Sequence, residues 1–437
     1  MIAGLFIIAL ATAVYAMLAH RLSQAGISAP MVFLALGYAL SMTGLLPHAG
    51  AERVLHLFAE IALVVVLFLD AAQTDLTALR RRHEWPVRML ALGMPLMVGL
   101  GTVAIYFIMP DMPLLTAALI AALLAPTDAA LGRAVVTNPV VPERVRRALT
   151  VESGLNDGLA LPAVLLFASL VAELDAGGQS GWLLFAAEQL ALGPLAGMAV
   201  GIAGGKALLF VVDRSWTRDA FEGLATLALA GTAYLAADLI GGNRFIAAFV
   251  AGLCFGNVVK GRCKFVYEFT EGEGQLVAWG AFFLMGLAVM PAALTQLSLP
   301  MFAVIALSLF VLRPLAIWLS LLGSDAAYIT RLFFGWFGPR GLATALFALI
   351  VLGRIDADLV SPVVALAMNA VWMSALLHGI SAEPGARLYA RRLKAIRSEA
   401  EDRELEDTAR RLVTIGPKEH RIERRPPDGS AEKPHDP

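Results

Sequence analysis

Apolar runs of about twenty residues recur along most of this chain, and a run of that length is what a helix needs to cross a bilayer. The chain is 58% hydrophobic and only 16% charged, whereas soluble domains average about a quarter charged residues. We therefore expect an all-α integral membrane protein with about thirteen transmembrane helices. The predicted spans lie near residues 1–19, 30–46, 54–73, 88–109, 112–133, 149–172, 182–211, 219–240, 244–259, 274–294, 299–322, 328–352 and 361–382.

The basic residues between these runs predict how the chain is oriented. Cytoplasmic loops of membrane proteins are enriched in Lys and Arg, and alternate loops of this chain carry most of them. With the N-terminus outside, the outer loops contain only Arg53, Arg244 and Arg354. This orientation places the C-terminus in the cytoplasm, and we expect a multi-pass protein of the bacterial cytoplasmic (inner) membrane. Residues 1–19 are expected to form an uncleaved helix, because no basic segment precedes them.

Composition also excludes several functions. The formal net charge is −1, which gives no reason to expect binding to nucleic acid. The two cysteines, Cys254 and Cys263, do not suggest a structural disulfide, and the histidines lack metal-ligand spacing. We expect no cofactor, and we expect membrane lipid to be a partner that surrounds the helices.

Two of the predicted spans contain residues that interrupt helices. Pro126 follows Ala125 in the fifth span, and the twelfth contains the sequence GPRG at 338–341. Paired interrupted helices are typical of transporters built from inverted repeats, with the substrate site between the breaks. We expect residues 30–211 and 219–382 to be the two repeats, with the first span as an addition.

Asp157 is the strongest candidate for the transport site. It lies deep in the sixth span, where an ionisable side chain costs about 2.5–3.5 kcal/mol on insertion scales. Ser153 shares its helix face, and the carbonyl of Thr127 at the first break would add a third oxygen ligand for a monovalent cation. A carboxylate in a dry site is stabilised by either a proton or a cation, so competition for Asp157 would couple two opposite fluxes. A structural role for Asp157, as a helix cap or a partner of an arginine, is the alternative.

Other buried polar residues surround this candidate site. Asp128 either binds the ion directly or accepts a hydrogen bond from Asn156 and holds the arms of the broken helices. Glu152 is expected to be a structural partner of Arg340 or Arg313, since a buried carboxylate needs a counter-charge. Asp70, in the third span, is a candidate for the inner mouth of an ion pathway.

The motifs APTDAAL, VESGLNDGLALP, LFLDAAQTDL and FGPRGLATAL, in this order, resemble the NhaP-type family of bacterial monovalent cation:proton antiporters. The likeness covers roughly residues 1–385. It implies thirteen helices, a homodimer, and a core domain that moves like an elevator against a dimerisation domain. It also implies cation binding by Thr127, Asp128, Ser153 and Asp157, with Glu152 bridged to an arginine. Members that have the Asn–Asp pair, here Asn156 and Asp157, are regarded as electroneutral. Many relatives have a glutamate-and-glycine pattern where this chain has LFLDAA.

The predicted function is therefore exchange of Na⁺ or Li⁺ for H⁺, which would serve pH homeostasis. A K⁺/H⁺ exchanger of the same fold is the nearest alternative, because ligand types alone do not separate these ions. An intramembrane aspartyl protease that uses Asp128 and Asp157 is a second alternative, and a membrane scaffold or sensor a third. Residues 386–437 are expected to form a charged cytoplasmic tail that begins as an exposed helix and ends without fixed structure.

Overall fold

The computed structural model describes residues 2–45, 51–74, 76, 84–175, 182–260, 273–352 and 357–396, and these residues form helices joined by short connections. Backbone amides and carbonyls in hydrocarbon must find partners inside their own segment, which favours helices throughout. The helices are α1 (Ile2–Gln24), α2 (Ala29–Thr43), α3 (Ala51–Ala72), α5 (Glu84–Arg88), η1 (Met89–Gly93), α6 (Met94–Ile108), α7 (Leu114–Leu123), α8 (Ala129–Val136), α9 (Glu143–Asp175), α10 (Trp182–Asp213), α11 (Asp219–Leu239), α12 (Arg244–Val259), α14 (Glu273–Ala288), α15 (Met290–Thr295), α16 (Leu299–Leu307), η2 (Ser308–Leu312), α17 (Arg313–Ser320), α18 (Tyr328–Trp336), α19 (Leu342–Leu352) and α20 (Ala357–Ile396).

The helices coincide with the predicted spans, and each predicted range contains helix. Six helical segments of the described chain are both long and apolar enough to cross a membrane. These are Ile2–Leu22, Glu84–Ile108, Glu143–Ala172, Glu188–Asp213, Leu299–Ser320 and Ser361–Ile396. Others, such as α2 and α12, are apolar but shorter. The all-helical membrane class is confirmed, and the full number of spans stays a prediction.

Both predicted interruptions are present. The fifth span is divided between α7 and α8, with non-helical backbone at Pro126, Thr127 and Asp128. The twelfth is divided between α18 and α19, and the chain between them includes Pro339 and Arg340. In both stretches a helix with one π-helical segment, η1 or η2, comes directly before the broken helix. This shared order supports a repeat, whose predicted boundaries stay a prediction.

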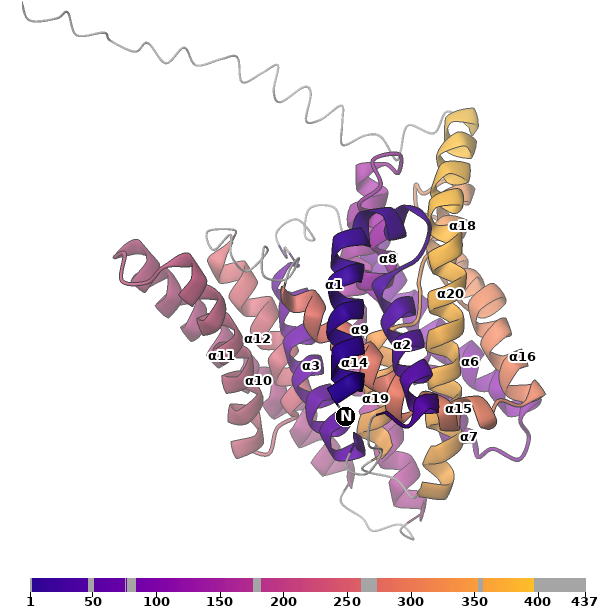
Figure 1. Ribbon diagram of the computed structural model, residues 1–437, viewed down its shortest axis with the longest axis horizontal. Coiled ribbons are helices and arrows are strands. Elements are labelled where there is room, and N and C mark those ends of the chain that lie inside the picture. Colours follow the sequence, from indigo (N-terminus) through magenta and orange to yellow (C-terminus); the bar gives the residue numbers. More distant parts are fainter. Residues whose placement is uncertain are drawn as a thin grey trace, which may run out of the picture.

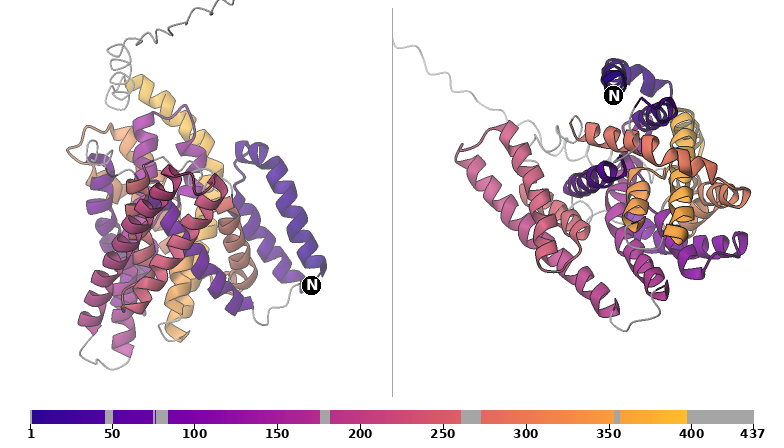
Figure 2. Two further views of the ribbon diagram at one scale, coloured as in Figure 1. Left: turned by 90° about the vertical axis from the view of Figure 1, so that its left-hand side faces the viewer. Right: turned by 60° about the horizontal axis from the view of Figure 1, so that its bottom comes forward.

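Helix α12 is fixed by close contacts with two neighbours. A Cβ atom on Gly252 would lie 2.1 Å from the carbonyl oxygen of Phe68 in α3, and one on Gly197 of α10 would lie 2.4 Å from that of Ala247. Glycine at these positions therefore lets the backbones approach, as small residues do at helix interfaces in membranes. Helices α10, α11 and α12 form one side of the molecule, and α6, α16 and α20 lie on the other (Figure 1). The view from below shows the same two groups on opposite sides (Figure 2, right).

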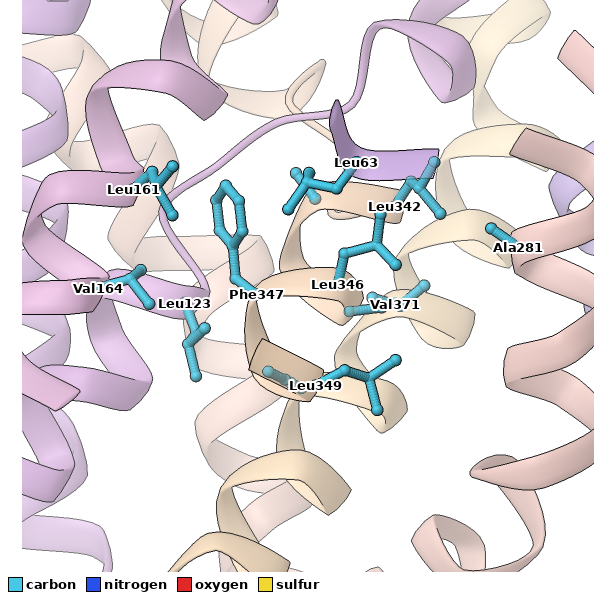
Figure 3. Packing of buried hydrophobic residues seen from close by; sticks show 14 of the residues in the cluster. Leu63, Leu123, Leu161, Val164, Ala281, Leu342, Leu346, Phe347, Leu349 and Val371 are labelled. Atoms are coloured by element: carbon cyan, nitrogen blue, oxygen red, sulfur yellow. The ribbon is translucent and has the colours of Figure 1, made fainter. Parts of the chain in front are cut away.

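Helix α19 lies at the centre of the hydrophobic core. Its side chains are buried around the whole helix, which is typical of a helix surrounded by others. Figure 3 shows Phe347 beside Leu123 of α7 and Leu161 of α9, while Leu346 lies beside Val371 of α20. This packing places the second break, at the N-terminal end of α19, next to the first break and α9.

Helix α20 extends past the predicted end of the last span. It continues without interruption to Ile396, and Tyr389 and Leu393 in its last turns are buried. The first part of the predicted tail is therefore helical, but it packs against the protein instead of being fully exposed. Residues 397–437 and Cys263 lie outside the described residues.

Candidate functional site

The polar residues predicted for the site converge where the two broken helices meet α9. Thr127 and Asp128 end the non-helical stretch before α8, and Glu152, Ser153, Asn156 and Asp157 lie along α9. All six are buried. Charged and polar groups persist in such a place when they serve transport or hold one another in position.

Asp128 connects the two breaks. Its Oδ2 accepts the amide hydrogen of Leu342 at 2.7 Å, at the start of α19, and its Oδ1 accepts that of Leu131 at 3.3 Å, in the first turn of α8. Its own amide donates to the carbonyl of Pro339 at 2.8 Å. A carboxylate stabilises the positive end of a helix dipole, and Asp128 does so for two helices. It therefore holds the broken arms, which is one of the two roles predicted for it.

Asn156 does not make its predicted bond to Asp128. Its Nδ2 donates to Thr127 Oγ1 at 3.2 Å and to Glu152 Oε1 at 3.0 Å, which uses both of its hydrogens. The predicted link therefore needs correction: Asn156 reaches the first break through the hydroxyl of Thr127. That hydroxyl lies 3.3 Å from Glu152 Oε2 and 3.4 Å from Ser153 Oγ.

Glu152 forms its ion pair with Arg313. The Nη2 of Arg313 lies 3.2 Å from Glu152 Oε1, and both side chains are almost completely buried, at 4% and 2% exposure. Because Glu152 also accepts hydrogen bonds from Thr127 and Asn156, its charge is neutralised and its oxygens are occupied. This arrangement fits the structural role predicted for Glu152.

Arg340, the other arginine predicted to pair with Glu152, binds elsewhere. It donates to the carbonyls of Leu124 at 2.9 Å and Gly338 at 2.7 Å, and to Ser308 Oγ at 3.3 Å. Leu124 lies just past the C-terminal end of α7, so Arg340 supplies the positive charge that a helix C-terminus favours. Of the two arginines predicted as partners, Arg313 pairs with Glu152, and Arg340 joins the breaks.

Asp157 differs from the other carboxylates. Its Oδ1 is buried and has no hydrogen-bond partner among the described residues, and the same is true of Asn156 Oδ1. The carboxylates of Asp128, Asp70 and Glu152 lie near enough to act electrostatically on Asp157. An unpartnered buried oxygen in negative surroundings is suited to bind a cation or a proton.

Asp70 reaches this region from α3. The backbone of α3 at the half-buried Asp70 lies close to α9, because a Cβ atom on Gly154 would lie 3.4 Å from the Asp70 carbonyl oxygen and from Thr74 Oγ1. This is an ordinary van der Waals distance, so the approach does not require glycine at position 154.

Sequence reasoning missed a second set of polar residues behind the second break. The amide of Arg340 donates to Ser374 Oγ at 2.7 Å, and the ring of His378 lies between Ser374 Oγ at 3.1 Å and the carbonyl of Trp336 at 2.8 Å. Ser374 and His378 are four residues apart in α20, so they share a helix face. That spacing was the available signal, but nothing in it pointed to the twelfth span.

Comparison with known proteins identifies the family. The family described as "Sodium/hydrogen exchanger, transmembrane" matches residues 6–387. The chain belongs to this family. The resemblance inferred from the APTDAAL and VESGLNDGLALP motifs is thus confirmed, and the family is one of transporters rather than enzymes.

Individual relatives agree with the family assignment. The chain is 27% identical over 389 residues to the "K(+)/H(+) antiporter NhaP2" of Shewanella baltica, covering 87% of this chain and 66% of that protein. It is 28% identical over 331 residues to the "K(+)/H(+) antiporter NhaP" of Alkalimonas amylolytica, covering 75% and 56%. The chain thus spans less than two thirds of the length of these relatives.

A solved structure shows the same fold. The sodium proton antiporter MjNhaP1 from Methanocaldococcus jannaschii matches with a TM-score of 0.72 and 21% identity, covering 89% of this chain and 98% of that one.

The geometry also bears on the protease alternative. That chemistry requires two carboxylates that share one water, and both carboxylate oxygens of Asp128 accept hydrogen bonds from amides. The exchanger family and this geometry together argue against an aspartyl protease.

Proposed function

We propose that this exchanger carries a monovalent cation in one direction and a proton in the other, with Asp157 as the shared binding group. The observation that supports this best is the buried, unpartnered Oδ1 of Asp157 beside the first break. The cost of burying a bare carboxylate favours one bound positive ion in each half-cycle. The proton and the cation then compete for one site, and neither crosses without the other crossing back.

The exchange is one cation for one proton, and therefore electroneutral. Among the neighbouring groups, Asn156 has no titratable proton, Glu152 is paired with Arg313, and both carboxylate oxygens of Asp128 accept hydrogen bonds from amides. Asp157 is the group left to exchange a proton. Ser153, four residues before Asp157 on α9, and the carbonyl of Thr127 are the further oxygen ligands that we propose.

Alternating access requires one group of helices to move against another. We take α3, α10 and α12 as members of the stationary group, because their backbones are in close contact. We take the two broken helices, α9 and α20 as the moving group, because hydrogen bonds join the two breaks. An elevator movement of this core against a dimerisation domain, in a homodimer of the cytoplasmic membrane with the N-terminus outside, is the arrangement we propose.

The transported cation is Na⁺ or Li⁺ in our primary proposal. A K⁺/H⁺ exchanger is the second candidate, because the relatives from Shewanella baltica and Alkalimonas amylolytica are named K(+)/H(+) antiporters. Selectivity between these ions depends on cavity size and ligand number, and oxygen ligands suit all of them.

Proton flux in proteoliposomes with a trapped pH dye tests the proposal. Addition of Na⁺, Li⁺ or K⁺ in turn is expected to drive proton movement in the wild type and not in Asp157→Asn. Asp111→Asn is a matched control, since Asp111 is an exposed carboxylate in the turn between α6 and α7. The ranking of the ions identifies the substrate. Absence of flux with every ion, in protein shown to be folded, would reject exchange.

A further inference from the structure

Phe249 packs directly against the α9 backbone beside Asp157. A Cβ atom placed on Gly158, the residue that follows Asp157, would lie 2.2 to 2.4 Å from three ring atoms of Phe249. The ring therefore occupies the space that any larger side chain at position 158 would need. Phe249 is 6% exposed and belongs to the main hydrophobic cluster.

The contact joins two groups of helices by a side chain instead of by backbone. Phe249 belongs to α12, whose backbone approaches α3 at Gly252 and α10 at Gly197, so α12 is fixed on those two sides. Toward α9, by contrast, it presents an aromatic ring. A ring on a glycine can slide or swing away without breaking backbone hydrogen bonds, whereas two backbones in close contact act as a unit.

An exchanger with its site in the membrane interior needs an apolar closure beside that site. Water that reached Asp157 from both sides at once would carry protons through and uncouple the two fluxes. Hydrophobic constrictions close pores by excluding water, and a buried aromatic ring covers a large area for one side chain. A ring one residue from Asp157, on a helix fixed outside the moving group, has the position that such a closure requires.

We propose that Phe249 is the barrier residue of this exchanger: its ring seals Asp157 from one side of the membrane and Gly158 is the surface on which it closes. This inference rests on the proposed function, because it assigns a role within the exchange cycle at Asp157. It also explains why glycine follows the aspartate in this chain. Phe249 is not a ligand of the ion, so its role is to exclude water and not to bind cargo.

The test is proton leak in the absence of a transported cation. Proteoliposomes with an imposed pH gradient are placed in choline medium with permeant thiocyanate to balance charge, and gradient decay is followed with a trapped pH dye. Phe249→Ala is expected to dissipate the gradient several-fold faster than the wild type. Phe249→Leu, which keeps an apolar side chain of similar reach, is expected to hold it.

Phe245→Ala is the matched control. Phe245 is also a buried phenylalanine of α12, one turn earlier, but its ring packs edge-to-face on Tyr234 of α11 at 5.5 Å. The variant Phe245→Ala removes the same number of atoms from the same helix, but away from Gly158. Equal leak from Phe249→Ala and Phe245→Ala would overturn the barrier, because the effect would then come from loosened packing of α12.

A second pair of variants tests the contact itself. Gly158→Ala is expected to slow cation-driven exchange several-fold, because the new methyl group meets the ring, and Phe249→Leu in the same background is expected to recover part of the rate. No recovery would contradict the contact. Cation-driven flux in the wild type tests the proposed function separately. A failure of the proposed function can therefore be distinguished from a failure of the barrier proposal.

Discussion

The carboxylate of Asp128 accepts the amide hydrogen of Leu342 at 2.7 Å, across 214 positions of the sequence. This bond joins the start of α19 to the start of α8, so the two broken helices are held at one point. Because each helix start has amides without intrahelical partners, one side chain satisfies donors of both. The site at Asp157 thereby has a fixed frame that can move as a unit.

Asp128→Ala is expected to lower stability more than Asp128→Asn. Alanine leaves the amides of Leu131 and Leu342 without an acceptor, at a cost of about 1–3 kcal/mol for each buried donor. Asparagine keeps one acceptor oxygen and loses the charge. Thermal unfolding in detergent measures both. Equal melting temperatures for wild type and Asp128→Ala would refute the bridging role.

Gly341→Ala is expected to be severely destabilising, because a Cβ atom there would lie 1.9 Å from Asp128 Oδ2. The methyl group would occupy the space in which Asp128 bonds Leu342, and the backbone on both sides has little freedom to yield. The control is Gly132→Ala in α8, where nothing lies within 4 Å of the added atom. Gly132→Ala is expected to be neutral or slightly stabilising, since alanine has the higher helix propensity. Similar yields of folded protein from both variants would contradict this account.

The sequence predicts the helical class and both breaks well, because apolar run length and Pro126 or Pro339 act locally. It also identifies every polar member of the site on α9. It does not predict which arginine meets Glu152, because both candidates are buried, Arg313 at the start of α17 and Arg340 in the second break. Their partners depend on how η2 and the second break pack against α9. The bond of Asp128 to Leu342 likewise depends on three-dimensional packing that no periodicity encodes.

The features that precede the two breaks bear on the repeat. With the predicted repeats at 30–211 and 219–382, the first break lies in the fourth span of its repeat and the second break in the fifth span of its repeat. Pairing η1 with η2, and the break after Leu123 with the one after Trp336, brings the two stretches into the same order. We infer that Glu84–Val136 corresponds to Leu299–Leu352. Short π-helical segments leave little trace in composition, so this correspondence is difficult to detect from the sequence.

Removal of Glu152 is expected to cost stability more than transport chemistry. Glu152→Ala leaves the buried Arg313 without its counter-charge, and breaking a buried ion pair costs about 3–5 kcal/mol. Replacing both partners, as in Glu152→Leu with Arg313→Met, is expected to recover much of that loss because no charge is left unpaired. Thermal melting of the single and double variants measures the coupling. Unchanged melting of Glu152→Ala with abolished exchange would instead make Glu152 part of the transport site.

The dependence of cation affinity on pH is expected to show competition for one carboxyl group. Where Asp157 is mainly protonated, the apparent KM for the cation should fall about tenfold for each unit that the pH rises, since one proton must leave before one cation binds. Above that range KM should become constant. The measurement is initial exchange rate against cation concentration at a series of pH values, with Asp111→Asn as the control for surface charge. A slope of two decades per pH unit would mean that a second group titrates with Asp157, and Asp128 would then be the first residue to test.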